Sequence, residues 1–181
     1  MTTNPEAQAR FRAALTAARA PGEAYAALQA LTQRLIGARL FTVMTVDMGA
    51  MLARRAYTSH PVDYPASGTK PIEMNDWFEI VHGRHESFVA NRLEEIDRVF
   101  PDAALIGRLG CGSVMNLPIL CAGELVATVN MLDAPAHFTP ARVALAEREI
   151  GLPALAALLV EDRLAASGGR GKASGGARPA P

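Results

Sequence analysis

The chain has 181 residues, of which half are hydrophobic, and its 18 basic and 18 acidic side chains give a formal net charge of zero. This composition suits one domain with a sizeable core. Zero net charge argues against nucleic acid or an anionic membrane as a partner, because neither would be attracted by a long-range field. The N-terminus has no basic segment followed by an apolar run, as a signal peptide would have, and no window of 18 residues is uninterruptedly apolar. We therefore expect a cytoplasmic protein.

Both ends of the chain carry helix signals. Asn4 followed by Pro5 is a typical helix start, so the segment 1–20 is predicted to form an N-terminal helix. A second helix is expected over about 23–36, where apolar residues recur at helical spacing and Gly37 follows as a stop.

The middle of the chain is predicted to alternate strands and short helices, since short β-branched or apolar runs are separated by turn residues. Prolines and a glycine in the segment 60–70 exclude a regular strand ladder there. The expected strands are 40–46, 51–59, 86–90 and a hairpin over 110–133 that turns at 122–124. The expected short helices are 75–83, 91–99 and 101–109.

A last helix is predicted from Pro140 to about Leu164, with a kink at Pro153. The remaining tail, 165–181, is rich in Gly, Ala, Ser and Pro, and from Ser167 onward it has basic but no acidic residues. We expect this tail to be disordered, because it cannot bury enough apolar surface to order itself. A weak anion-binding role is the alternative.

This order of elements predicts an α+β fold with a central antiparallel sheet of about five to six strands. The terminal helices are expected to pack on one face of the sheet. Loops and short helices are expected to cover the other face. The domain formed in this way spans 21–164.

Small and polar residues interrupt the otherwise apolar hairpin over 110–133. They are Cys111, Ser113, Asn116, Thr128 and Asn130. A sheet that keeps such groups on an apolar face often lines a cavity, so we expect a small-molecule pocket there.

The segment between 57 and 70 gathers aromatic, hydroxyl, imidazole and ammonium groups. Its candidate ligand-binding residues are Tyr57, Ser59, His60, Tyr64 and Lys70. Such groups suit an anionic or aromatic small ligand. The alternative is that the two tyrosines pack the loop onto the core and Lys70 is solvated. Trp77 is either a wall of the pocket or a core residue.

The two cysteines are ten positions apart on an extended segment, which argues against a disulfide between them. Cys111 follows a predicted helix C-terminus, whose negative dipole end disfavours a reactive thiolate. A buried structural role or a place in the pocket wall is therefore expected for Cys111, and Cys121 is expected to be structural.

Metal binding and acid–base catalysis are not expected. The histidines are His60, His82, His85 and His137. They have no carboxylate or cysteine at metal-ligand spacing. Glu94 and Glu95 lie on what we predict to be a solvated helix face. We therefore expect no metal and no cofactor.

Ordered short motifs make the chain resemble the GAF domain family, in particular a bacterial subfamily, over roughly 23–161. The motifs are 55–61, 64–65, 68–71, Trp77, 100–102, 109–111, Ser113, 116–118, 123–124 and 128–130. The resemblance implies a sensory fold with a pocket between the sheet and its covering loops. A sister group of GAF proteins reduces free methionine sulfoxide with cysteines in this region, whereas bilin attachment usually requires a Cys-His pair that Cys111 lacks.

We therefore expect a small-molecule-binding sensory or regulatory GAF-like domain without a fused output module, a binding protein rather than an enzyme. One alternative is a thiol-dependent reductase that uses Cys111. A second is a dimeric interaction protein, because the apolar faces of the terminal helices suit pairing across a two-fold axis.

Overall fold

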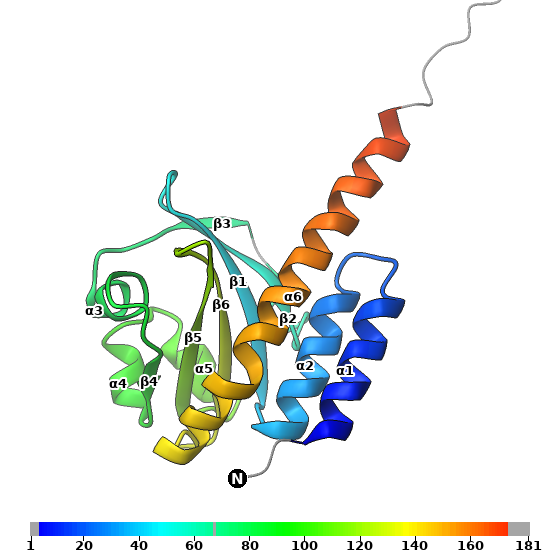
Figure 1. Cartoon of the computed structure of the whole chain (residues 1–181). Helices are drawn as coiled ribbons and strands as arrows, with labels where there is room; N and C mark the ends of the chain where they lie inside the picture. The colour runs from blue at the N-terminus through cyan, green and yellow to red at the C-terminus, as the bar shows by residue number, and fades with distance from the viewer. Residues whose placement is uncertain (1–3, 67, 174–181) are drawn as a thin grey trace, which may run out of the picture.

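A six-stranded sheet lies between two layers of helices in the computed structural model, which describes residues 4–66 and 68–173 (Figure 1). The strands are β1 (Leu40–Asp47), β2 (Leu52–Thr58), β3 (Thr69–Pro71), β4 (Phe88–Ala90), β5 (Ser113–Cys121) and β6 (Glu124–Asp133). Their order in the sheet is β3-β2-β1-β6-β5-β4, and each neighbouring pair is antiparallel. The predicted α+β class and antiparallel sheet are confirmed.

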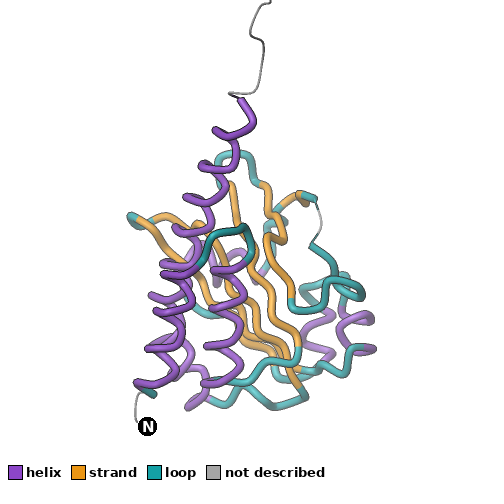
Figure 2. The backbone as a smooth tube through the Cα atoms, turned by 90° about the vertical axis from the view of Figure 1, so that its right-hand side faces the viewer, coloured by secondary structure: helices purple, strands orange, loops and turns teal. Residues whose placement is uncertain are grey.

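Three helices from the two ends of the chain cover one face of the sheet (Figure 2). They are α1 (Pro5–Ala17), α2 (Glu23–Leu35) and α6 (Pro140–Ala173). Phe11, Leu28 and Ile150 from these helices share one apolar core with Phe41 and Met131 of the sheet. The expectation that terminal helices share one face is thus confirmed.

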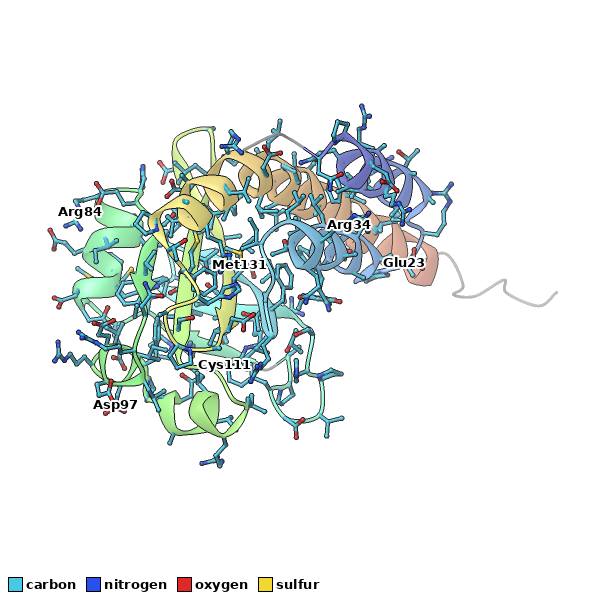
Figure 3. The ribbon with its side chains drawn as sticks, turned by 90° about the horizontal axis from the view of Figure 1, so that it is seen from below. Glu23, Arg34, Arg84, Asp97, Cys111 and Met131 are labelled. Carbon is cyan, nitrogen blue, oxygen red and sulfur yellow. The ribbon has the colours of Figure 1, made fainter. Side chains whose placement is uncertain are left out.

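Shorter helices and loops cover the opposite face. They are α3 (Asp76–Phe78), the π-helix η1 (Glu79–Gly83), α4 (Leu93–Asp97) and α5 (Ala103–Arg108). A second apolar core lies on this side and includes Leu40, Ile106 and Leu132. Figure 3 shows Met131 beneath the terminal helices and Cys111 on the side of the short helices.

Helix α1 begins as its sequence predicts, whereas the cap of α2 comes from elsewhere in the chain. The Asn4 side chain accepts a hydrogen bond from the Ala7 backbone N–H at 3.0 Å. The residue before α2 is Gly22, with a φ of 93° and no side chain to cap the helix. Glu161 of α6 supplies the missing acceptors: its carboxylate accepts hydrogen bonds from the backbone N–H groups of Gly22 and Ala24 at 2.7 and 2.9 Å.

Two boundaries differ from the sequence expectation. Helix α6 continues to Ala173, so the expected end near Leu164 is wrong, and 165–173 is helical instead of disordered. Extending an existing helix through Ala165 and Ala166 is easier than starting a new one. The rest of the expected tail, 174–181, lies outside the described residues.

The second difference is β3, which lies within and just after the segment expected to lack a ladder. Its three residues pair with Leu52, Ala53 and Arg54 of β2. Pro71 is tolerated because β3 is an edge strand, where a missing N–H does not break the sheet. Within the described residues, none of the helices combines the length and apolar character needed to span a membrane.

Candidate functional site

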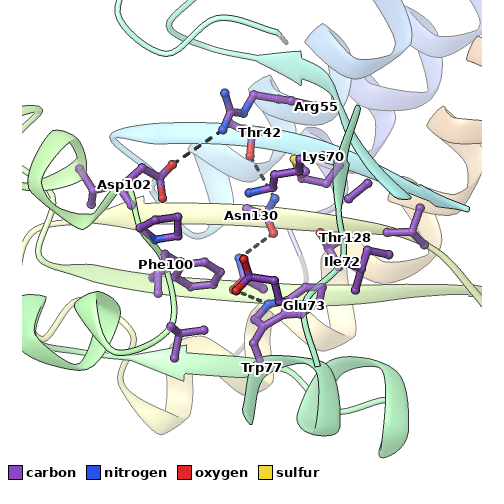
Figure 4. A pocket seen from close by; sticks show the side chains of 18 of the residues that line it. Thr42, Arg55, Lys70, Ile72, Glu73, Trp77, Phe100, Asp102, Thr128 and Asn130 are labelled. Atoms are coloured by element: carbon purple, nitrogen blue, oxygen red, sulfur yellow. Dashed lines mark hydrogen bonds and ion pairs between the residues drawn. The ribbon is translucent and has the colours of Figure 1, made fainter. Parts of the chain in front are cut away.

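A cavity of about 230 Å³ lies between the sheet and the segments that cover its second face (Figure 4). Strands β1, β2, β5 and β6 form its floor. Tyr64 and residues between Lys70 and Trp77 cover it on one side, and residues between Val99 and Ile106 cover it on the other. Much of its wall is apolar, with Phe100, Ile106, Val114 and Leu132 among the lining residues. An apolar hollow with a few polar groups is typical of a small-molecule site.

A row of hydrogen-bonded polar side chains crosses the cavity floor. Asn116 of β5 lies opposite Asn130 of β6, which lies opposite Thr42 of β1. Asn116 Nδ2 donates to Asn130 Oδ1 at 2.6 Å, and Asn130 Nδ2 donates to Thr42 Oγ1 at 3.1 Å. At the other end, Trp77 Nε1 donates to Asn116 Oδ1 at 3.1 Å. We call Trp77, Asn116, Asn130 and Thr42 the polar row.

The indole at one end sets the direction of every hydrogen bond in the polar row. Because Trp77 Nε1 can only donate, Asn116 must present its oxygen to it and its NH₂ group to Asn130. The same reasoning turns the Asn130 NH₂ group toward Thr42. The Thr42 hydroxyl then accepts, and its own proton remains to donate. The row therefore offers unused N–H and O–H donors on the cavity floor.

Arg55 faces the same cavity from β2, and a β-bulge separates it from Tyr57. Val43 pairs with Tyr57 and Met44 pairs with Arg55, so Ala56 is the extra residue. A bulge of this kind resets the alternation of faces. Ala56 and Tyr57 both pack toward the terminal helices, whereas Arg55 lines the cavity.

Arg55, Tyr64 and Asp102 form a cluster at one end of the cavity. The Arg55 guanidinium lies 3.8 Å over the centre of the Tyr64 ring, and its Nη1 donates to the Pro65 carbonyl at 2.8 Å. The Tyr64 hydroxyl donates to Asp102 Oδ2. Burial, and next the charge of Asp102, raise the pKa of Tyr64. This phenol therefore stays protonated and keeps its bond to Asp102 across the physiological pH range.

Six of the eleven residues that the sequence suggested for ligand binding line the cavity. They are Tyr64, Lys70, Trp77, Asn116, Thr128 and Asn130. They come from the hairpin and from both ends of the loop that covers the sheet. The structure thus brings together the two segments that the sequence had suggested separately.

The other five suggested residues lie away from the cavity: Tyr57, Ser59, His60, Cys111 and Ser113. The Tyr57 ring packs against Tyr25 and Phe41 on the helix side, and its hydroxyl bonds Gln29. Ser59 Oγ accepts from the Phe41 N–H and contacts His60 Nδ1.

Strand alternation explains the position of Ser113. It is three residues before Asn116, so the two side chains cannot share a face of β5. The Ser113 hydroxyl instead donates to the Ala134 carbonyl at 2.7 Å.

The cavity residues that were not suggested for ligand binding include Thr42, Arg55 and Asp102. Thr42 is a polar residue in a largely apolar strand, and only its hydrogen bond with Asn130 shows that it belongs to the polar row. Arg55 lies two residues after Ala53 on the cavity face of β2, but the sequence does not show which face of this strand turns toward the cavity. Asp102 belongs to one of the family motifs, but nothing in the sequence placed it beside Tyr64.

Cys111 is buried in the second core, away from the cavity. Burial raises the pKa of its thiol from 9.0 to about 11, although the nearby Arg39 partly opposes this. A thiol with such a pKa is almost entirely protonated near neutral pH, and the thiolate is the nucleophile. The site therefore favours a structural role for Cys111.

We expect Cys111 to react slowly with Ellman's reagent at pH 8. A rise of two pKa units leaves roughly a hundredfold less thiolate than an ordinary thiol has, and burial slows access further. The reaction rate should climb as the pH approaches 11. Cys111→Ser should remove this slow phase and leave the Cys121 phase. Fast modification of Cys111 at neutral pH would contradict this expectation.

The histidines do not form a cluster with other ligand types. Across residues 4–66 and 68–173, no group of three His, Cys, Asp or Glu side chains is arranged to hold a metal ion. His82 and His85 have ring centres 6.4 Å apart, and His137 contacts the carbonyls of Ile36 and Gly37.

Solved structures share this arrangement of sheet, helices and covering loops, although no protein-family model and no curated protein matches the sequence. The GAF domain of a two-component sensor histidine kinase from Bacillus halodurans aligns with a TM-score of 0.64 at 11% identity. That alignment covers 81% of this chain and 99% of the other. The fold is GAF-like.

Two further structures support the GAF-like fold. The GAF domain of a phosphoenolpyruvate-protein phosphotransferase from Coxiella burnetii has a TM-score of 0.59 at 15% identity, covering 92% of this chain and 96% of that one. A GAF domain/HD domain protein from Geobacter sulfurreducens gives 0.58 at 15% identity, with 79% and 92% covered. The GAF-like architecture expected from the sequence motifs is confirmed.

Proposed function

We propose that this GAF-like domain is a cytoplasmic sensory or regulatory module of the bacterial kind that binds a small molecule in the cavity over its sheet. The observation that carries the proposal is the polar row on the floor of an otherwise largely apolar cavity. Buried amide and hydroxyl groups that keep unused donors are well suited to orient a ligand. The GAF domains of sensor proteins that share the fold support the same role.

A library of small metabolites, screened by thermal shift, tests this proposal. A ligand at a hundred times its dissociation constant stabilises the folded state by about 2.7 kcal/mol. Ala53 is buried on β2 and lines the cavity, so Ala53→Phe should fill it and abolish the shift. Ala53→Ser leaves the cavity open and serves as the matched control. If no compound shifts the wild-type protein, the binding proposal is wrong.

We also propose that the protein is a homodimer that pairs through its terminal helices. Leu152 and Leu159 are seven residues apart on α6, and their exposed fractions are 76% and 53%. This spacing places them on one stripe of the helix. Helix α6 also extends beyond the rest of the domain (Figure 1), and its exposed stripe at Leu152 and Leu159 is available to a second copy.

Leu152→Arg with Leu159→Arg should therefore convert a dimer into a monomer, because two charges would be buried at the interface. Light scattering coupled to gel filtration measures the mass directly. Val62→Arg adds a charge at another exposed apolar residue, 87% exposed, and should leave the dimer intact. A wild-type monomer at high concentration would contradict the dimer proposal.

The reductase alternative receives less support. It needs an attacking thiolate near its substrate, but Cys111 has a raised pKa and lies outside the cavity. We expect that Cys111→Ser shows the same ligand-induced thermal shifts as the wild type. We also expect that the wild type does not turn over methionine sulfoxide.

A further inference from the structure

The side chain of Arg55 carries more hydrogen-bond donors than the surrounding protein uses. We propose that Arg55 determines the specificity of the cavity by selecting small ligands that carry a carboxylate. This inference rests on the proposed binding function and names the chemical class of ligand. It also gives a role to a charged residue that shares the cavity face of β2 with Ala53.

The guanidinium of Arg55 is held in place but under-bonded. Its side chain is only 12% exposed. Of its five N–H donors, one is used by the Pro65 carbonyl, while Nε is buried without a partner among the described residues. A buried donor that stays unpaired costs free energy, so each such group in a folded protein calls for an explanation, and an acceptor on a bound molecule would supply one. Stacking on Tyr64 fixes the plane of the guanidinium without using its donors.

Asp102 does not occupy the hydrogen-bond donors of the Arg55 guanidinium. Arg55 Nη2 and Asp102 Oδ2 form an ion pair at 3.9 Å, a separation too long for a hydrogen bond, so this contact leaves the donors of the guanidinium free. The same carboxylate oxygen accepts the Tyr64 hydroxyl proton, and this bond draws Asp102 toward the phenol. A ligand carboxylate would feel some repulsion from Asp102, but the phenol weakens it by sharing the negative charge. The planar donor fork of arginine is well matched to a carboxylate.

Other groups of the cavity also favour a ligand rich in acceptors. The polar row leaves the Thr42 hydroxyl proton and amide protons unused on the floor. Lys70 reaches over this floor from β3, as Figure 4 shows. Lys70 and Glu73, an acidic residue that also lines the cavity, are both exposed, so their opposite charges offset each other and the buried Arg55 supplies the excess of donors. Donors therefore outnumber acceptors where a bound molecule would meet the protein.

The size and the walls of the cavity restrict the rest of the ligand. A volume of about 230 Å³ is below the roughly 300–1,000 Å³ of pockets for drug-sized molecules. It suits a molecule on the order of ten to fifteen non-hydrogen atoms. Phe100, Ile106 and Val114 provide apolar contact surface for a hydrocarbon or aromatic body. The fitting class is a small carboxylate with an apolar body.

Matched pairs of carboxylates and primary amides test this assignment, because the members of a pair differ mainly in charge. The probes are benzoate and benzamide, phenylacetate and phenylacetamide, and 4-methylpentanoate and 4-methylpentanamide. Isothermal titration with the full chain, supported by Trp77 fluorescence, gives their affinities. We expect at least one carboxylate to bind at least tenfold more tightly than its amide.

Arg55→Gln should weaken carboxylate binding at least tenfold and change amide binding less than twofold. Arg54→Gln is the matched control: it removes the same charge from the adjacent, exposed residue, which does not line the cavity. It should leave both affinities unchanged. If Arg55→Gln does not fold, Arg55→Lys, which keeps the charge but loses the donor fork, should still reduce the preference for the carboxylate.

Equal affinity of wild-type protein for both members of every pair would overturn the inference, as would a loss on Arg55→Gln that is the same for acids and amides. Binding of neutral library compounds without any carboxylate would refute the role of Arg55 and leave the binding function intact. If no compound of either charge binds, the proposed function fails, and this inference fails with it.

Discussion

Glu161→Ala is expected to lower the free energy of unfolding by about 2–4 kcal/mol, a large effect for one residue far from the cavity. Glu161 is only 8% exposed, and its two carboxylate oxygens accept the backbone N–H groups of Gly22 and Ala24. Alanine would leave the buried Ala24 N–H without a partner. It would also remove a negative charge from the N-terminus of α2, where the helix dipole favours one.

The cap supplied by Glu161 is unusual because it joins two helices that are distant in sequence. Gly22 has no side chain to cap α2, so this helix depends on α6 for what a local Ser or Asp usually provides. The contact therefore stabilises both α2 itself and its packing against α6. Loss of Glu161 should weaken the whole helical layer.

Urea unfolding followed by circular dichroism measures this effect. Asp162→Ala is the matched control, because Asp162 is the adjacent acidic residue and is exposed; it should change stability by less than about 0.5 kcal/mol. Glu161→Gln should fall between the two, since the amide keeps one acceptor but loses the charge. If Glu161→Ala and Asp162→Ala are equally stable, the capping role is wrong.

Asn130→Ala is expected to destabilise the protein by about 2–4 kcal/mol, because it removes the centre of the polar row. Asn130 is 8% exposed and bonds both Asn116 and Thr42. Alanine would leave an amide donor of Asn116 unpaired in a buried site. Water entering the cavity would recover only part of this loss, since the row lies beneath apolar walls.

Thr128→Val provides the comparison. Thr128 lies two residues from Asn130 on the same face of β6 and lines the same cavity, but it makes no side-chain hydrogen bond to the residues that the structure describes. We expect a change of less than about 1 kcal/mol for this variant. A double-mutant cycle between Asn130→Ala and Thr42→Val should give a coupling energy above about 0.5 kcal/mol. Strict additivity would show that the two side chains act independently.

How far the sequence alone predicts the cavity residues differs from one strand to another. Asn116, Thr128 and Asn130 were recognisable because polar residues stand out in apolar strands, and two of them share a face by simple alternation. Alternation alone also excludes Ser113 from that face. Tyr57 was suggested for ligand binding but packs on the helix side, because the bulge at Ala56 breaks the alternation that would otherwise place it on the same face as Arg55.

The sequence by itself determined the local elements and the layers they form. Helix caps, hydrophobic periodicity and turn residues act over a few positions, so Asn4, Gly37 and the turn at 122–124 could be interpreted directly. Only the tertiary structure decided which groups meet across long separations, as for Glu161 with Ala24 or Tyr64 with Asp102. Those contacts depend on register, bulges and helix packing, which no single stretch of sequence encodes.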